Sequence, residues 1–143
     1  MFELDPSKIN DHVPADCDPS KHHPTLCAER GWQLLQGEDS AREGAALLSS
    51  LCEAGNIDAC QDLGAWLIAK PTLGEQSQGR ELLQRACAAD HALACYHLGL
   101  LYRDGTTKLD ADEERAASTL EKSCGGFYRP ACFELRGAPK ENE

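Results

Sequence analysis

The stretch CEAGNIDAC (residues 52–60) places two cysteines eight positions apart around an Ala-Gly-Asn turn signal. The same spacing recurs in CAADHALAC (residues 87–95) and CGGFYRPAC (residues 124–132), while Cys17 and Cys27 form a fourth close pair ten positions apart. These pairs use all 8 cysteines of the chain. Independent metal or redox sites would not need to recur at regular intervals, whereas a repeated fold would, so the pairs indicate a repeat.

Other residues follow the cysteine pairs in phase. The first cysteines of the three equally spaced pairs are separated by 35 and 37 residues (87 − 52 and 124 − 87), a period that suits a helix–turn–helix unit. Four positions after the second cysteine stands a glycine, and seven after it a bulky residue. Four positions before the first cysteine stands leucine, and eight before it a small residue. The positions are Gly31, Gly64 and Gly99; Leu34, Leu67 and Tyr102; Leu48, Leu83 and Leu120; and Gly44, Gly79 and Ala116.

These offsets predict helices with one buried face. Positions 0, 3, 4 and 7 lie on the same side of a helix, so Cys60, Leu63, Gly64 and Leu67 form one stripe. A glycine inside a helix costs about 1 kcal/mol relative to alanine. The repeated mid-helix glycine therefore predicts the close approach of a neighbouring helix.

No segment alternates with the period of two that strands show, so the chain is predicted to be all-α. Ser40 with Glu43, and Asp110 with Glu113, match the capping-box pattern, and the acidic run 110–114 then lies at a helix start rather than in a calcium loop. Residues 1–23 are expected to be irregular, residues 24–136 to form the repeats, and residues 137–143 a flexible tail. The helices are expected near residues 24–37, 40–54, 57–70, 77–89, 92–104, 112–125 and 129–136.

Composition limits the classes of partner. Charged residues make up 27% and hydrophobic residues 41% of the chain, as in a folded domain, and no apolar run reaches the about 18–20 residues of a membrane span. The formal charge of −10 would repel nucleic acid and anionic lipid and would attract a basic protein. Acidity that only keeps the protein soluble is an equally good interpretation.

In these residues the chain resembles the Sel1-like (TPR-like) repeat family, whose units read A…LGxxYxxG…A…L…A. LGLLYRDG (98–105) is the nearest match, and LGAWLIAK (63–70) lacks the tyrosine and the final glycine. The cysteine pair in each unit is similar to the cysteine-rich form of the Helicobacter cysteine-rich proteins. Arg30, Arg136 and the wider Cys17–Cys27 pair depart from the pattern in the terminal units. The resemblance covers about residues 25–136 and implies an α/α solenoid of helix–turn–helix repeats, with one disulfide per unit and a role in protein–protein interaction.

Three roles are open for the cysteines. A cysteine that ends one helix and another that opens the next can meet the Cα separation of about 4.4–6.8 Å that a disulfide needs. Zinc modules favour shorter C-x(2–4)-C spacings, although Cys17, His22, His23 and Cys27 could supply a Cys2His2 set. Redox catalysis would need a C-x-x-C motif, which is absent from the sequence. Disulfides are therefore the preferred interpretation, and no metal or cofactor is expected.

The predicted function is a non-catalytic module that binds a partner protein on a concave helical surface, as a scaffold or as an inhibitor. The charge of the chain favours a basic partner. The alternatives are a β-lactamase-like or penicillin-binding activity, as suggested for cysteine-rich relatives, and the metal site just described. Candidate partner contacts lie on the first helix of each unit, outside the core stripe. They are Gln33, Trp66, Tyr96, His97, Leu100 and Arg103. A tryptophan that fills the gap between repeats is an equally good interpretation of Trp66.

Localisation is predicted from the cysteines. Disulfides persist in oxidising compartments, so a periplasmic or secreted protein whose leader has been removed is expected. The start MFELDPSKIN lacks the basic and apolar regions of a signal peptide. The C-x9-C spacing of Cys17 and Cys27 leaves the mitochondrial intermembrane space as the alternative.

Overall fold

The computed structural model describes Cys17, Lys21 and residues 23–136, which contain only helices, turns and loops. The predicted all-α class is therefore confirmed for the described residues, while the predicted tail 137–143 and most of segment 1–23 lie outside them. The chain divides into two compact units, Met1–Ala59 and Cys60–Glu143, so the division falls inside α3. The helices are α1 (Pro24–Leu35), α2 (Ala41–Glu53), α3 (Ile57–Ile68), α4 (Leu73–Ala88), α5 (Ala92–Asp104), α6 (Glu113–Gly125) and α7 (Arg129–Arg136).

The predicted helix boundaries hold to within two residues except at the start of α4. This helix begins at Leu73 instead of residue 77, because Thr72 caps it. The Thr72 side chain accepts a hydrogen bond of 3.1 Å from the Glu75 backbone N–H and donates one of 2.8 Å to the Glu75 carboxylate. Thr72 and Glu75 match the capping pattern in the sequence, which the expected start at residue 77 leaves out.

Both predicted capping boxes are wrong in detail. Ser40 stands at the N-cap of α2 but makes no capping bond; its hydroxyl instead donates to the Leu34 carbonyl at 2.7 Å. The cap of α6 is Asp112 rather than Asp110, and its carboxylate accepts a hydrogen bond from the Arg115 N–H at 3.1 Å. Because Glu113 and Glu114 occupy the first turn of α6, the acidic run does lie at a helix start, as predicted.

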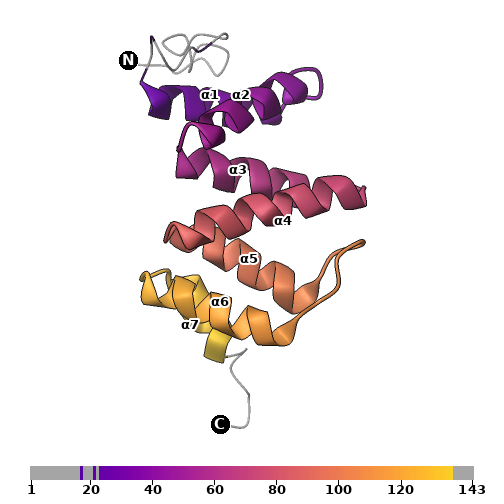
Figure 1. Cartoon of the computed structure of the whole chain (residues 1–143), viewed down its shortest axis with the longest axis vertical. Coiled ribbons are helices and arrows are strands. Elements are labelled where there is room, and N and C mark those ends of the chain that lie inside the picture. The colour runs from indigo at the N-terminus through magenta and orange to yellow at the C-terminus, as the bar shows by residue number, and fades with distance from the viewer. Residues whose placement is uncertain (1–16, 18–20, 22, 137–143) are drawn as a thin grey trace, which may run out of the picture. The chain divides into compact units, whose positions relative to one another are not determined.

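The first unit is built on α1 and α2, which lie side by side (Figure 1). Glycines on both helices permit the close contact. A Cβ atom added at Gly31 would lie 2.7 Å from the Leu48 Cγ, and one added at Gly44 would lie 2.7 Å from the Gly31 carbonyl oxygen. Both distances are shorter than atoms tolerate, so the backbones approach each other only because both residues lack a side chain.

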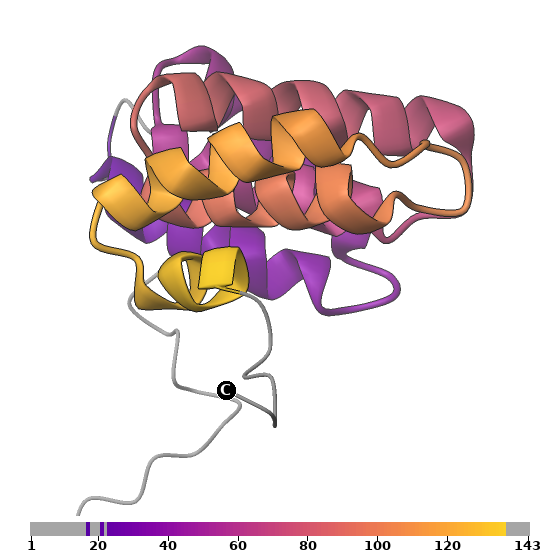
Figure 2. The same cartoon turned by 90° about the horizontal axis from the view of Figure 1, so that it is seen from below.

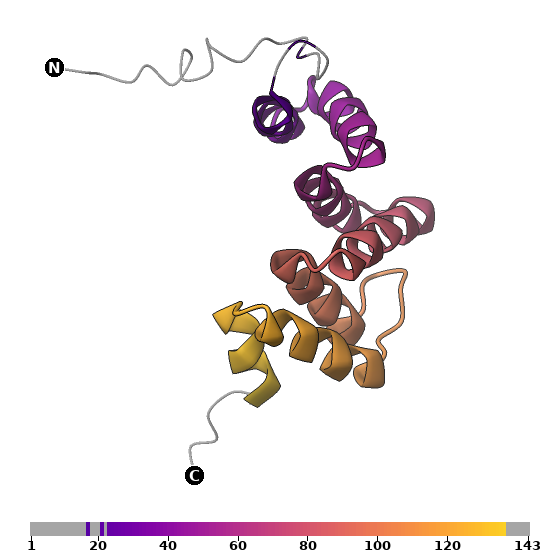
Figure 3. The same ribbon diagram turned by 60° about the vertical axis from the view of Figure 1, so that its left-hand side comes forward.

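The second unit repeats this contact twice. A Cβ atom added at Gly79 of α4 would lie 2.7 Å from the Gly64 carbonyl oxygen of α3, and one added at Gly99 of α5 would lie 2.6 Å from the Leu120 side chain of α6. The last helix, α7, returns against α6 (Figure 3). The sequence prediction that the mid-helix glycines mark close helix contacts is confirmed in both units.

The predicted stripes form the buried core. The leucines four positions before each first cysteine, Leu48, Leu83 and Leu120, are at most 3% exposed. The bulky residues seven positions after each second cysteine are buried as well; they are Leu34, Leu67 and Tyr102. Hydrophobic burial at these positions stabilises each helix pair.

The turn in CEAGNIDAC recurs at the other two equally spaced cysteine pairs. The third residue after the first cysteine has a positive φ each time: 100° at Gly55, 66° at Asp90 and 67° at Phe127. The next residue donates its backbone N–H to the carbonyl just before the first cysteine, at 2.9–3.2 Å, closing a Schellman-type helix end. In two of the turns, the side chain of that next residue caps the following helix. Asn56 accepts a hydrogen bond from the Ala59 backbone N–H, and His91 accepts one from the Ala94 backbone N–H.

The cysteines next to these turns are all in disulfides. The Cα atoms lie 4.6 Å apart in Cys87–Cys95, 4.8 Å in Cys124–Cys132 and 5.3 Å in Cys17–Cys27. Cys52 and Cys60 are disulfide-bonded too, so none of the eight cysteines is free. Four disulfides fit an oxidising compartment. Among the residues that the structure describes, no helix is long and apolar enough to cross a bilayer.

Candidate functional site

The second unit contains a cavity of about 330 Å³ between α3 and α5. Ala65 and Ile68 of α3 and Leu100 of α5 form apolar walls, and the buried Leu83 of α4 also lines it. This cavity, here called the α3–α5 groove, forms because small and aliphatic residues recur at helical spacing on the facing sides of α3 and α5. Its volume lies at the lower end of the range for ligand pockets, about 300–1,000 Å³, and suits one or two apolar side chains.

His97 lines the same groove from α5 and is held by a buried side chain of α3. The Gln61 amide Nε2, in a residue only 4% exposed, lies 2.8 Å from His97 Nδ1. An amide nitrogen donates, so Nδ1 accepts and the imidazole proton is on Nε2. Burial lowers the pKa of His97, with a smaller contribution from the charge of His91. His97 is therefore a neutral, fixed hydrogen-bonding group at neutral pH.

A second cavity, of about 600 Å³, adjoins the groove and shares Ile68 and Thr106 with it. Lys70, just after α3, and Lys108, in the connection between α5 and α6, both border this cavity. We call these two lysines the basic mouth. The apolar groove therefore opens toward a cavity edged by positive charge.

A buried glutamine holds the lysine-bearing segments in place. Gln76 of α4 is 2% exposed, and its amide donates to the Lys70 carbonyl at 2.7 Å and to the Thr107 hydroxyl at 2.9 Å. Its carbonyl oxygen accepts from the Thr106 hydroxyl and from the Lys108 backbone N–H. Figure 2 shows the connection between α5 and α6 extending past the end of α5. The sequence does not point to Gln76, because a single glutamine without a motif gives no signal of its burial.

Of the six predicted partner contacts, His97 and Leu100 lie in the groove. Trp66 of α3 is half-buried, and the Lys70 ammonium stands 3.9 Å from its ring centroid. This cation–π contact favours a position for Lys70 beside the second cavity. Trp66 is thus neither a core residue nor fully exposed. Gln33 is half-buried on α1 in the first unit.

Tyr96 does not line the groove. Its ring lies 5.0 Å from the Tyr128 ring, which stands just before α7, and 5.9 Å from the His97 ring. Burial raises the pKa of Tyr96, and the nearby Glu134 carboxylate raises it further. The tyrosine therefore stays protonated and belongs to the contact between α5 and the C-terminal turn.

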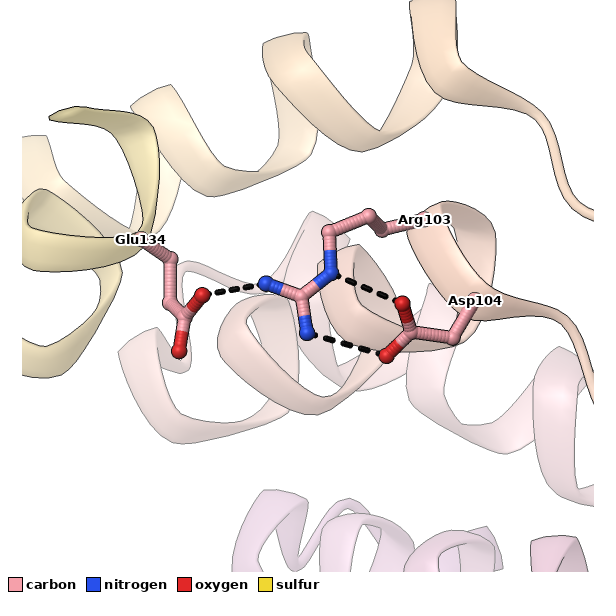
Figure 4. Close-up of polar contacts among 3 residues, drawn as sticks. All are labelled: Arg103, Asp104 and Glu134. Atoms are coloured by element: carbon pink, nitrogen blue, oxygen red, sulfur yellow. Dashed lines mark hydrogen bonds and ion pairs between the residues drawn. The ribbon is translucent and has the colours of Figure 1, made fainter. Parts of the chain in front are cut away.

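Arg103 joins α5 to α7 (Figure 4). Two of its guanidinium nitrogens donate to the two carboxylate oxygens of Asp104 at 2.9 Å each, and the third donates to Glu134. These hydrogen bonds raise the pKa of Arg103 and lower that of Asp104. Since all three nitrogens have intramolecular partners, Arg103 would have to give up existing bonds before it contacted another protein.

Three of the four residues of the alternative metal site, Cys17, His23 and Cys27, take part in other interactions. The sulfur atoms of Cys17 and Cys27 are bonded to each other, and a thiolate is required to bind zinc. His23 caps α1, where its Nδ1 accepts from the Thr25 N–H at 3.2 Å, and His22 lies outside the described residues. The described residues contain no group of three or more His, Cys, Asp or Glu that could hold a metal ion.

Comparison with known proteins adds no identification. No protein-family model matches this sequence, and no curated protein shows significant similarity to it.

Proposed function

We propose that the protein is a non-catalytic interaction module of disulfide-closed, Sel1-like repeats arranged as an α/α solenoid, and that it binds a partner protein through the first helices of its repeats. The repeated turn supports the repeat assignment, because the same backbone conformation and the same capping bonds recur beside cysteine pairs. The glycine contacts support it too, since they recur at the same offsets.

The α3–α5 groove carries the functional proposal. Its apolar walls, its neutral His97 and the half-buried Leu100 provide a preformed surface. Disulfides and helix packing hold that surface rigid, so binding a partner would immobilise few groups and lose little conformational entropy. Among the residues predicted to contact the partner, His97 and Leu100 are the ones this proposal retains as direct contacts.

The compartment proposed is the periplasm or the exterior, with the mitochondrial intermembrane space as the alternative. The four disulfides support an oxidising space in either case. The salt dependence of partner binding would distinguish a scaffold from an inhibitor of a basic protein. Because the chain has a formal charge of −10, its binding to a basic protein would weaken steeply with added salt. Binding through a mainly apolar groove would depend less on salt. The β-lactamase-like or penicillin-binding alternative stays a prediction.

The test compares two aspartate substitutions. Leu100→Asp places a charge in the groove, whereas Leu73→Asp places the same charge at an exposed site on α4. Affinity capture from the producing cells, with quantitative mass spectrometry, should lose a specific partner with Leu100→Asp and keep it with Leu73→Asp. Circular dichroism first establishes that both variants are folded. A partner retained equally by wild type and by Leu100→Asp would contradict the proposal.

A further inference from the structure

The basic mouth differs from the rest of the chain in its charge. The whole sequence has a formal charge of −10, yet two lysines border one cavity in the second unit. Lys70 is directed by the Trp66 ring, and the Lys108 backbone is fixed by Gln76. Because both lysines border the same cavity, their positive charges favour a negative group there.

The carboxylates in the ion pairs of the second unit do not neutralise this mouth. Both oxygens of Asp104, which lines the neighbouring groove, are bound by Arg103. The cations of the described ion pairs in the second unit are Arg103, Arg115 and Lys122. Lys70 and Lys108 therefore present ammonium groups with hydrogen-bonding capacity, and the hydroxyls of Thr106 and Thr107 line the same cavity.

From this juxtaposition we infer that the groove binds an acidic peptide segment of the partner, with a bulky aliphatic side chain between α3 and α5 and a neighbouring carboxylate at the basic mouth. This inference rests on the proposed function and specifies the chemistry of the partner. The apolar walls exclude a purely charged ligand from the groove, and the lysines favour a carboxylate beside the apolar anchor. The net charge of the chain would attract a basic segment, whereas the two lysines at this site favour an acidic one.

Three capped peptides test this chemistry directly. Acetyl-Glu-Leu-Glu-amide carries the apolar anchor and a carboxylate on each side, so either chain direction can satisfy the mouth. Acetyl-Gln-Leu-Gln-amide is its neutral isostere, and acetyl-Glu-Ala-Glu-amide lacks the anchor. Titration of the oxidised full chain is followed through the backbone amide resonances of Ile68, Leu100 and Thr106. Saturable shifts are expected with the first peptide by about 10 mM, and binding at least about 3-fold weaker with either control.

Charge-removing variants locate the carboxylate. The double variant Lys70→Gln, Lys108→Gln should weaken binding of the acidic peptide about 3-fold or more, to the level of the neutral peptide. Lys122→Gln is the matched control, since Lys122 pairs with Asp90 away from the groove. Equal binding of all three peptides, absence of saturable shifts, or no effect of the double variant would overturn the inference.

The outcomes separate this inference from the proposed function. If the partner is lost with Leu100→Asp but captured equally by the double lysine variant, the interaction module stands and the carboxylate contact is wrong. If the acidic peptide binds as expected while partner capture ignores Leu100→Asp, the groove chemistry stands and the proposed function is wrong.

Discussion

Gly64 and Gly79 show how two absent side chains determine the distance between two helices. The Gly79 carbonyl oxygen lies 3.0 Å from the position that a Cβ atom of Gly64 would take, and the Gly64 carbonyl oxygen lies 2.7 Å from that of Gly79. In the first unit, the Gly31 carbonyl oxygen likewise lies 2.7 Å from the position that a Cβ atom of Gly44 would take. At these positions the low helix propensity of glycine is outweighed by the packing that it permits.

Gly79→Ala is expected to lower the free energy of unfolding by about 1–3 kcal/mol, because the added methyl group overlaps the backbone of α3. Gly74→Ala is the control in the same helix. No atom lies within 4 Å of its Cβ position, so the substitution should be neutral or stabilise by up to about 1 kcal/mol. Urea unfolding followed by circular dichroism measures both. A Gly79→Ala protein as stable as Gly74→Ala would show that the contact does not limit the packing.

His97 couples stability to pH. Its pKa is lowered in the folded state, so the unfolded chain takes up the proton first as the pH falls below about 6.5. The imidazole therefore contributes no penalty above that pH and destabilises the fold progressively below it. Replacing His97 by Gln should reduce the loss of stability between pH 7 and pH 5. The measurement is the urea midpoint at both pH values, and an unchanged pH dependence would contradict the assignment.

The repeated turn is the feature that matters most at the scale of elements. It requires a positive φ three residues after the first cysteine, a conformation that suits glycine. Gly55 meets this requirement without strain, whereas Asp90 and Phe127 adopt it at a cost. Phe127 is 93% exposed, so its ring contributes little packing in return.

Phe127→Gly is therefore expected to stabilise the protein by about 1 kcal/mol, because it relieves the left-handed backbone of a bulky residue. Thermal unfolding should show a higher midpoint. Phe133→Gly is the contrasting variant: Phe133 is also exposed, at 57%, but lies inside α7, where glycine should destabilise. A lower midpoint for Phe127→Gly would mean that the ring makes a stabilising contact.

A buried side chain of α4, Gln76, binds the connection between α5 and α6. Gln76→Leu keeps the volume of this residue and removes its four hydrogen bonds, leaving the Lys70 carbonyl and the Lys108 N–H without that partner. A loss of about 2–3 kcal/mol is expected. Faster amide exchange at Lys108 should accompany it, whereas the exposed Gln78→Leu should change neither quantity. Unchanged exchange in Gln76→Leu would show that the connection is held by other contacts.

For the whole molecule, the disulfides add stability that the small cores, each built from few helices, supply only in part. Loops of about nine residues give a chain-entropy contribution of about 2.6 kcal/mol for each bridge. The Cys87→Ala, Cys95→Ala double variant should lose about this amount, and full reduction should lower the thermal midpoint much further. Intact mass with and without reduction should differ by about 8 Da, two hydrogen atoms for each of four bridges. Helicity and a midpoint unaffected by reduction would contradict a stabilising role.

The sequence by itself determined the all-helical class, the buried stripes and the close approach of a neighbouring helix at the repeated glycines, because helical periodicity is a local property that repeats along the chain. It also indicated the cysteine pairs, since their spacing recurs in phase with the repeat. Only the tertiary structure decided the site. His97 and Leu100 line a groove, Arg103 is instead occupied by Asp104 and Glu134, and Gln76 holds a connection about 30 positions away. Such contacts join residues distant in sequence, and no local pattern specifies which polar side chain becomes buried between them.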